Sequence, residues 1–237
     1  MKMIYITGDK HADFTNIYYF CENYKTSKKD TLIVIGDTGI NYYANKRDEV
    51  AKNILLEEPI TFFCIHGNHK ERPENLKDYK TKIFHKGIVY YEEKYPNILF
   101  AKDGEIYKFN KNKVLVIGGA YSVDKDYRLQ YGYNWYESEQ PSEKTNEKVL
   151  KMINKHQDID IILSHTCPYK YIPREMFISG INQSTVDFNT EKFLDKVEEK
   201  VNYKYWYCGH YHTDKKIDKI RFMFNDIDEF KSTSNNY

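Results

Sequence analysis

Little in this chain points to a secreted or membrane-spanning protein. Its four cysteines, Cys21, Cys64, Cys167 and Cys208, are spaced singly, and no Cys-x-x-Cys pair occurs. The spacing therefore gives no sign of a zinc knuckle or a redox motif, and we expect reduced cysteines packed as small hydrophobes. No apolar run reaches the roughly 20 residues of a membrane helix. The opening "MKMIYITGD" turns polar too early for a secretory signal, so we expect a cytoplasmic protein with no membrane partner.

An excess of either charge is also missing. The 237 residues carry 36 Lys and Arg against 35 Asp and Glu, a formal net charge of +1. Proteins that bind nucleic acid usually present a basic face, and the composition gives no strong signal of one. Hydrophobic residues make up 41% of the chain, enough for one substantial core. With no repeat or obvious linker, we expect a single domain over residues 1–225 and a polar C-terminal tail over 226–237.

Apolar runs recur along the chain and end at glycine or a polar residue. Continuous runs of this kind are typical of strands that are covered on both faces. Helical patterns over 14–24, 45–58, 142–156 and 190–201 alternate with them, which favours an α/β fold. The region 88–118 is dense in short strands and 216–224 reads as a late strand or hairpin arm, so mixed sheets fit better than one parallel sheet. The long connections 121–141 and 166–189 are of a length that is usually functional or disordered. The strand-like stretches are 3–7, 31–37, 61–68, 113–119, 160–165 and 204–210.

Residues able to bind a metal follow nearly every one of these strands. In open α/β sheets the carboxyl ends of the strands form the ligand crevice, so these side chains are expected to gather in one place. The His-x-His pair near the end of the chain adds to this, because side chains at i and i+2 of an extended segment share a face. The residues concerned are Asp9, His11, Asp37, Asn68, His69, His165, His210 and His212.

The mixture of carboxylate, imidazole and amide groups suits Mn²⁺, Fe²⁺ or Zn²⁺. Two such ions, about 3.5–4 Å apart, can clamp a displacement at phosphorus and produce a hydroxide near neutral pH. Two ions need a bridging ligand, and Asp37 is the natural candidate.

Five short motifs that contain these residues occur in an order known from one protein family. The blocks "GDKH" (8–11), "GDTG" (36–39), "GNHK" (67–70), "SH" (164–165) and "GHYH" (209–212) resemble the motif series of the calcineurin-like metallophosphoesterases. The resemblance implies an αββα sandwich, a four-layer fold in which two mixed β-sheets are flanked by helices. It also implies a hydrolase that uses two divalent ions, Mn²⁺ first, with Fe, Zn or Ni as alternatives.

The same resemblance implies roles for individual residues. Asp9, His11 and His212 would hold one ion, Asp37 would bridge, and the second ion would take Asn68, His165 and His210. A hydroxide held by the ions would attack phosphorus in line. His69 would contact the phosphate beside Asn68 and protonate the leaving oxygen.

Three positions depart from the family pattern. Lys70 stands where an acid commonly follows the GNH histidine, so Glu71 or Asp13 could take over that role, or Lys70 is solvated and a backbone carbonyl orients His69. Ala12 replaces a common glycine, which would cost about 1 kcal/mol if the position needs a positive φ. The segment "GDTGINYY" also lacks the Asp-Arg pair of the protein-phosphatase branch.

A replacement for that missing arginine lies further along the chain. The stretch "GGAYSVDKDYR" (118–128) resembles one in a bacterial and phage subgroup of the family, and Lys125 or Arg128 in it could contact substrate. A solvated surface loop is the alternative.

The expected function is hydrolysis of a phosphodiester or phosphomonoester in a small substrate, with a nucleotide as one candidate. A phosphoprotein phosphatase is an alternative that the missing Asp-Arg pair disfavours. A non-catalytic scaffold or a module that binds a phosphorylated ligand is the alternative from another class, and the complete ligand set argues against it.

Overall fold

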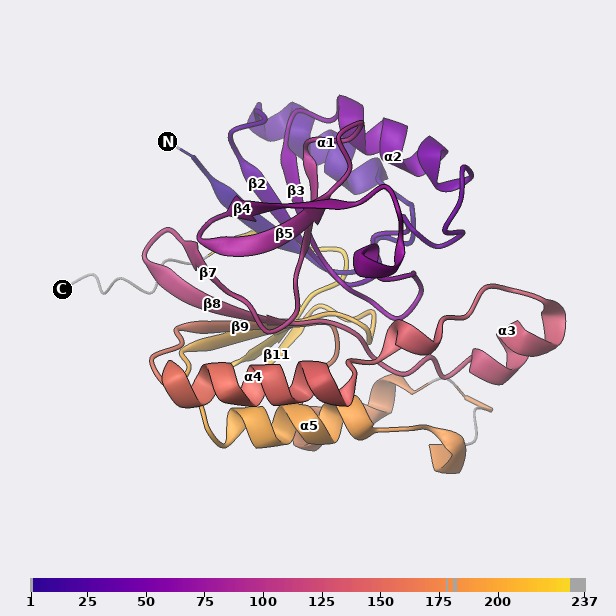
Figure 1. Cartoon of the computed structure of the whole chain (residues 1–237), viewed down its shortest axis with the longest axis vertical. Helices are drawn as coiled ribbons and strands as arrows, with labels where there is room; N and C mark the ends of the chain where they lie inside the picture. The colour runs from indigo at the N-terminus through magenta and orange to yellow at the C-terminus, as the bar shows by residue number, and fades with distance from the viewer. Residues whose placement is uncertain (1, 178, 181–182, 231–237) are drawn as a thin grey trace.

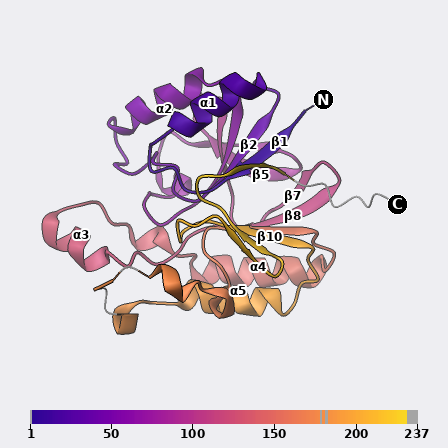
Figure 2. The same cartoon turned by 180° about the vertical axis from the view of Figure 1, so that it is seen from behind.

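Two β-sheets lie between two layers of helices. The structure is a computed structural model that describes residues 2–177, 179–180 and 183–230. Figures 1 and 2 show α1 and α2 covering one sheet, and α4 and α5 covering the other. Both sheets mix parallel and antiparallel strands, so the predicted four-layer αββα sandwich is confirmed.

The first sheet has seven strands in the order β13-β1-β2-β3-β6-β5-β4. Its centre is parallel, and β13, β5 and β4 pair antiparallel at its flanks. The parallel centre places the carboxyl ends of β1, β2 and β3 at one edge. The strands are β1 (Ile4–Thr7), β2 (Thr31–Ile35), β3 (Thr61–Ile65), β4 (Lys80–Phe84), β5 (Gly87–Tyr91), β6 (Ile98–Ala101) and β13 (Ile227–Glu229).

The second sheet has six strands in the order β11-β12-β10-β9-β8-β7. Here β8, β9, β10 and β12 run parallel, while β7 and β11 are antiparallel edge strands. The β11–β12 hairpin confirms the strand or hairpin predicted over 216–224. The strands are β7 (Ile106–Phe109), β8 (Asn112–Ile117), β9 (Ile161–Ser164), β10 (Tyr205–Cys208), β11 (Lys215–Ile217) and β12 (Ile220–Phe222).

The four predicted helices are present, with ends that differ by a few residues. Ser142 caps α4 as expected, since its Oγ accepts a hydrogen bond of 3.2 Å from the Thr145 amide. Another helix, α3, occupies part of the predicted loop 121–141 and projects from the body of the molecule (Figure 1). The helices are α1 (Thr15–Tyr24), α2 (Asp48–Glu57), α3 (Lys125–Tyr131), α4 (Glu143–Lys155) and α5 (Asn189–Glu198).

The sheets bury apolar side chains on both faces, which explains the continuous apolar runs in the sequence. Phe63 of β3 meets Tyr107 and Phe109 of β7 between the sheets, with ring centroids 4.8 and 5.0 Å apart. Two further clusters lie under α1 and α2 and under α4 and α5. Among the described residues, no helix is long and apolar enough to cross a membrane.

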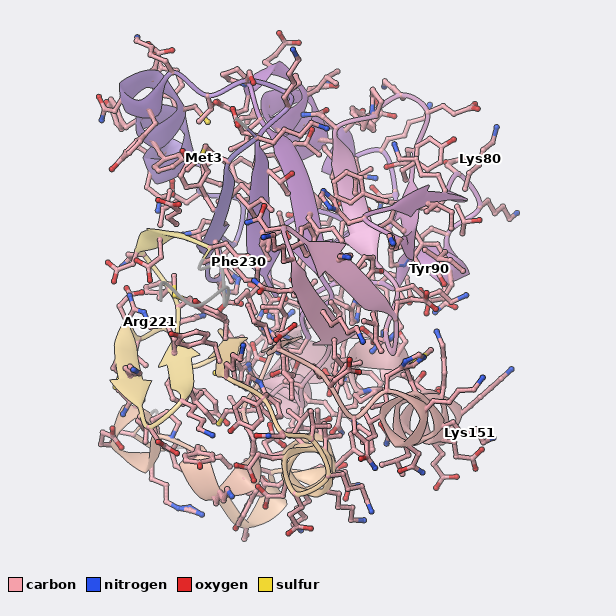
Figure 3. All side chains as sticks on the ribbon, turned by 90° about the vertical axis from the view of Figure 1, so that its left-hand side faces the viewer. Met3, Lys80, Tyr90, Lys151, Arg221 and Phe230 are labelled. Atoms are coloured by element: carbon pink, nitrogen blue, oxygen red, sulfur yellow. The ribbon has the colours of Figure 1, made fainter. Side chains whose placement is uncertain are left out.

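The end of the chain differs from the expected polar tail. Ile227–Glu229 forms β13 along β1, and Phe230 is buried in the cluster between the sheets (Figure 3). The polar residues around it hid this short edge strand in the sequence, and the boundary predicted at 226 is wrong to that extent. Residues 231–237 of the predicted tail lie outside the described residues.

Candidate metal centre

The ends of five parallel strands, from both sheets, converge on one cluster of polar side chains. Contacts across the sheets hold it together. Asp9 Oδ2 accepts a hydrogen bond of 2.7 Å from the His210 amide, and His165 Nε2 lies 2.7 Å from Asn68 Oδ1. The structure thus brings together all of the predicted metal ligands, which are Asp9 and His11 after β1, Asp37 after β2, Asn68 after β3, His165 after β9, and His210 and His212 after β10.

Asp37 lies at the centre of this cluster. Its carboxylate belongs to two groups of candidate ligand atoms, one with His11 and His69 and the other with Asp9 and His165. Within each group the atoms lie within 4.8 Å of one another. Burial alone would raise the pKa of Asp37, but His165, His69 and His11 together hold that pKa well below its usual range. Asp37 is therefore an anionic group common to both groups of candidate ligand atoms.

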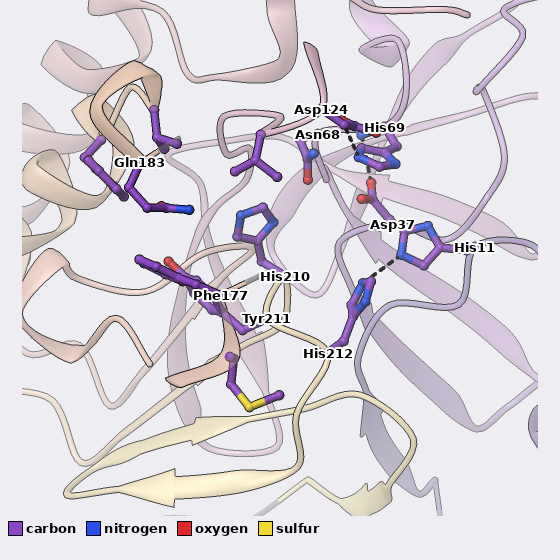
Figure 4. Close-up of a pocket in the computed structure, with 14 residues that line it drawn as sticks. His11, Asp37, Asn68, His69, Asp124, Phe177, Gln183, His210, Tyr211 and His212 are labelled. Atoms are coloured by element: carbon purple, nitrogen blue, oxygen red, sulfur yellow. Dashed lines mark hydrogen bonds and ion pairs between the residues drawn. The ribbon is translucent and has the colours of Figure 1, made fainter. Parts of the chain in front are cut away.

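The backbone near the predicted ligands is strained. His11, His210 and His212 have φ values of 45°, 68° and 48°, in the left-handed region that residues other than glycine rarely adopt. Such strain persists only where the surrounding structure enforces it, and it clusters at functional sites. The result is that His11 Nε2 and His212 Nε2 point at each other, 2.9 Å apart (Figure 4).

Two glycines allow the ligands to approach so closely. A Cβ at Gly67 would lie 2.0 Å from Asp37 Oδ1, and a Cβ at Gly36 would lie 1.9 Å from His165 Nδ1. Both are far inside any allowed contact, so the motif glycines are required by the packing of the site.

The same atoms fit divalent metal ions. His165 Nδ1 is buried without a hydrogen-bond partner in the described part of the chain, and its ring is fully shielded from solvent. Burial lowers the pKa values of His210 and His212, which favours the neutral imidazoles that ligate metals. An anionic carboxylate among neutral imidazoles and an amide oxygen is a donor set suited to Mn²⁺, Fe²⁺ or Zn²⁺.

His69 faces the pocket from the turn after β3. Its amide donates to Asp37 Oδ1 at 3.0 Å, while Arg128 Nη2 of α3 lies 2.7 Å from its Nδ1. Asp124 Oδ1 is 3.8 Å from His69 Nε2 and its other oxygen binds Arg128 Nε at 2.8 Å. Burial lowers the pKa of His69 and Arg128 adds to this, whereas Asp37 and Asp124 oppose it.

The structure answers the question raised by Lys70. Its side chain is 0% exposed, so the prediction of a solvated Lys70 is wrong. Glu71 accepts from Ser138 Oγ at 2.7 Å, and Asp13 accepts from the amide of Thr15, the first residue of α1, at 3.0 Å. Both carboxylates are thus bound elsewhere.

Asp124 is the acid beside His69, and sequence reasoning missed it. Its spacing of four residues from Arg128, the (i, i+4) spacing of a helical ion pair, was the available signal.

The structure also shows where the other residues discussed with the family pattern lie, namely Ala12, Arg128 and Lys125. Ala12 has a φ of 66°, so this position does require the left-handed conformation. Arg128 reaches the site, as described above. Lys125 does not line the pocket: its Nζ lies 4.0 Å from the centre of the Trp135 ring.

A pocket of about 300 Å³ opens at this cluster. One side holds predicted ligands, and the other is lined mostly by apolar residues of the two long connections, with Phe177 and Gln183 labelled in Figure 4. These residues are Val123, Met176, Phe177, Gln183, Val186 and Phe188. Sequence reasoning treated these connections only as long loops, because they carry no motif.

Solved structures with this architecture exist. One is TT1561 of Thermus thermophilus, which is 14% identical with a TM-score of 0.51, covering 94% of this chain and 88% of that chain. Another is a phosphopantetheinyl hydrolase from Mycobacterium tuberculosis, 12% identical with a TM-score of 0.44, covering 94% of this chain and 88% of that chain. At these identities the first likeness concerns the fold alone, and the second is too distant to support an argument. A comparison with curated protein sequences finds no significant match.

The sequence comparison with protein families is decisive. Residues 2–214 match the calcineurin-like phosphoesterases, a span that holds every predicted metal ligand. The chain belongs to this family, whose members hydrolyse phosphoesters with divalent metal ions.

Proposed function

We propose that this chain hydrolyses the phosphate ester of a small phosphorylated molecule with two divalent ions, Mn²⁺ first among them. The observation that carries the proposal is the position of Asp37, whose carboxylate is shared by two groups of candidate ligands. By the motif pattern of the family, one ion would be held by Asp9, His11 and His212 and the other by Asn68, His165 and His210, with Asp37 common to both. The two groups of ligand atoms in the structure divide these residues differently, because one pairs His11 with His69 and the other pairs Asp9 with His165. Bound there, the ions would neutralise phosphate charge and make water nucleophilic near neutral pH.

We infer that His69 handles the proton of the leaving group. Because Arg128 donates to Nδ1, the neutral imidazole carries its proton on Nε2. In the reaction the oxygen of water forms a new bond to phosphorus and the ester P–O bond breaks. The departing oxygen takes the proton of Nε2, and the proton that water loses returns to Nε2, so the neutral ring is restored. The Nε2–H group can equally donate to a phosphate oxygen before that step.

Arg128 supports His69 from behind rather than binding substrate directly. It is 8% exposed, and its guanidinium also donates to Asp124 and to the Asn134 carbonyl oxygen at 3.0 Å. These contacts engage Arg128 with protein groups, so we propose that it positions His69. This replaces the expectation that Arg128 contacts substrate.

Ser122 has a similar role behind Asn68. The Asn68 amide nitrogen donates to Ser122 Oγ at 2.8 Å, which turns the amide oxygen towards His165. The Ser122 amide in turn donates to Glu139 at 3.1 Å. Partners of this kind orient the ligands that bind a metal directly.

Release of p-nitrophenol from mono- and bis-p-nitrophenyl phosphate tests this function. The full chain loaded with Mn²⁺ should hydrolyse at least one of the two, and the preferred ester assigns the monoesterase or diesterase class. His69→Ala and Asp37→Ala should each lose most of the rate, while His156→Ala, at an exposed position outside the cluster, should keep it. Absence of hydrolysis with every divalent metal would reject the proposal.

A further inference from the structure

The pocket has an apolar side that the metal centre does not need. Val123, Met176, Phe177, Val186 and Phe188, here called the apolar wall, line the pocket. Gln183 lies on the same side as a neutral polar residue, and Asp124, Tyr211 and the predicted ligands complete the lining. In Figure 4, Phe177 lies across the pocket from His69 and Asp37. The wall therefore borders the space next to the position of a bound phosphoryl group.

Two members of the apolar wall are unusually exposed. Met176 is 41% exposed and Val123 is 38% exposed, and both line the pocket. Phe188 has a fixed position, because its ring meets Tyr169 edge-on with centroids 5.3 Å apart. Apolar side chains gathered at the mouth of a polar site mark a surface that a ligand covers.

The charges around the pocket limit what that ligand can be. Among the described residues that line it, none is Lys or Arg, and the charged ones are Asp37 and Asp124 beside the histidines. A second phosphate or a carboxylate on the wall side would lose its hydration without gaining a cation. The volume of about 300 Å³ is at the small end of ligand pockets.

We propose that the site selects esters with a single phosphoryl group whose remaining organic part is uncharged and apolar or aromatic, and packs on the apolar wall. The inference rests on the proposed function and deepens it by naming the substrate class. It disfavours nucleoside diphosphates, bisphosphates and esters of hydroxy acids.

Two substrate series test the proposal with the Mn²⁺-loaded full chain. The first consists of p-nitrophenyl diesters whose second group is ethyl, butyl, phenyl or 2-carboxyethyl, so that the leaving group stays constant. The second compares butyl phosphate with glycerol phosphate by release of phosphate. We expect kcat/KM to rise about fourfold for each methylene that reaches the wall, and to fall for the carboxylate and glycerol esters.

Variants link this preference to the wall. Met176→Gln and Val123→Thr add polarity with little change in volume at exposed positions, so they should fold normally and reduce the preference for butyl over ethyl. Val50→Thr on α2, 69% exposed and outside the pocket lining, is the matched control and should leave the preference unchanged. A flat series, or a preference that both wall variants retain, would overturn the proposal.

Binding separates this inference from the proposed function. Phenylphosphonate and 2-carboxyethylphosphonate are not hydrolysed, and calorimetry compares their affinities without turnover. If phenylphosphonate binds more tightly than 2-carboxyethylphosphonate and Met176→Gln weakens its binding, the apolar wall is supported. This holds even if no ester is cleaved, because absence of hydrolysis rejects only the proposed function. Hydrolysis together with equal binding of the two phosphonates rejects the wall alone.

Discussion

The ammonium group of Lys70 donates a hydrogen bond of 2.6 Å to the carbonyl oxygen of Gly36, the residue before Asp37. It also donates to Ile65 at the end of β3, at 3.0 Å. One buried cation thus ties together the ends of β2 and β3 beneath the shared carboxylate. The position that departs from the family pattern serves as an internal support of the site.

Removing this support should destabilise the protein. Lys70→Met keeps the length of the side chain but leaves two buried carbonyl oxygens without their donor, and we expect a loss of about 3 kcal/mol in the free energy of unfolding. Urea denaturation measures it. Lys151→Met, at an exposed position on α4 (Figure 3), is the control and should change stability by less than about 0.5 kcal/mol. Equal stability of both variants would contradict the support role.

Arg128 should act on catalysis through His69. Arg128→Ala removes the donor to His69 Nδ1, so the ring loses its fixed orientation, and we expect kcat to fall about 10- to 100-fold with a smaller change in KM. Steady-state kinetics on the preferred nitrophenyl ester measure both constants. Arg47→Ala, at an exposed position before α2, is the control. A rise in KM at constant kcat would instead indicate direct substrate binding.

Ala12 offers a stabilising substitution. Because its φ is 66°, glycine can adopt this conformation without the penalty that a Cβ brings, and Ala12→Gly should raise the free energy of unfolding by up to about 1 kcal/mol. The same change in α2, Ala51→Gly, should lower it by about 1 kcal/mol. Denaturation curves that show a loss for both variants would disprove the strain at position 12.

Glu191 should make stability depend on pH. Burial raises the pKa of this carboxyl from 4.5 to about 7, although it accepts a hydrogen bond of 2.8 Å from Thr166 Oγ1. Between pH 4.5 and about 7, Glu191 loses its proton in the unfolded chain but keeps it in the folded chain. The stabilisation of the folded state by protonated Glu191 is therefore complete below pH 4.5 and is lost as the pH rises to about 7. The expected loss is roughly 3 kcal/mol.

A pair of variants isolates this effect. Glu191→Gln should flatten that part of the pH profile and make the protein more stable than the parent at pH 8, while the exposed Glu199→Gln should leave the profile unchanged. Urea denaturation at several pH values measures this. A free energy of unfolding that changes between pH 5 and pH 8 by the same amount in the parent, in Glu191→Gln and in Glu199→Gln would contradict the burial effect.

Much of the fold and the candidate ligand cluster could be predicted from the sequence. The reason is physical: strands covered on both faces leave continuous apolar runs, and the polar residue that ends each parallel run lies at a shared edge. Asp9, Asp37 and His165 could therefore be placed together before their distances were known.

The remaining features depend on contacts between distant segments. The burial of Lys70 requires the ends of β2 and β3 to meet around it, and Asp124 reaches His69 only because the start of α3 lies beside the turn after β3. Met176 and Phe177 line the pocket from a long connection whose sequence shows no periodic pattern of apolar residues. Local patterns carry no information about such approaches.

Titration of the metal-free chain with Mn²⁺ tests the central claim most directly, with bound metal and nitrophenyl ester hydrolysis recorded on the same samples. We predict two ions per chain, a rate that follows their binding, and loss of both rate and full occupancy in Asp37→Asn. Hydrolysis that persists in a chelator, or full occupancy by two ions in Asp37→Asn, would contradict a metal centre built around this shared carboxylate.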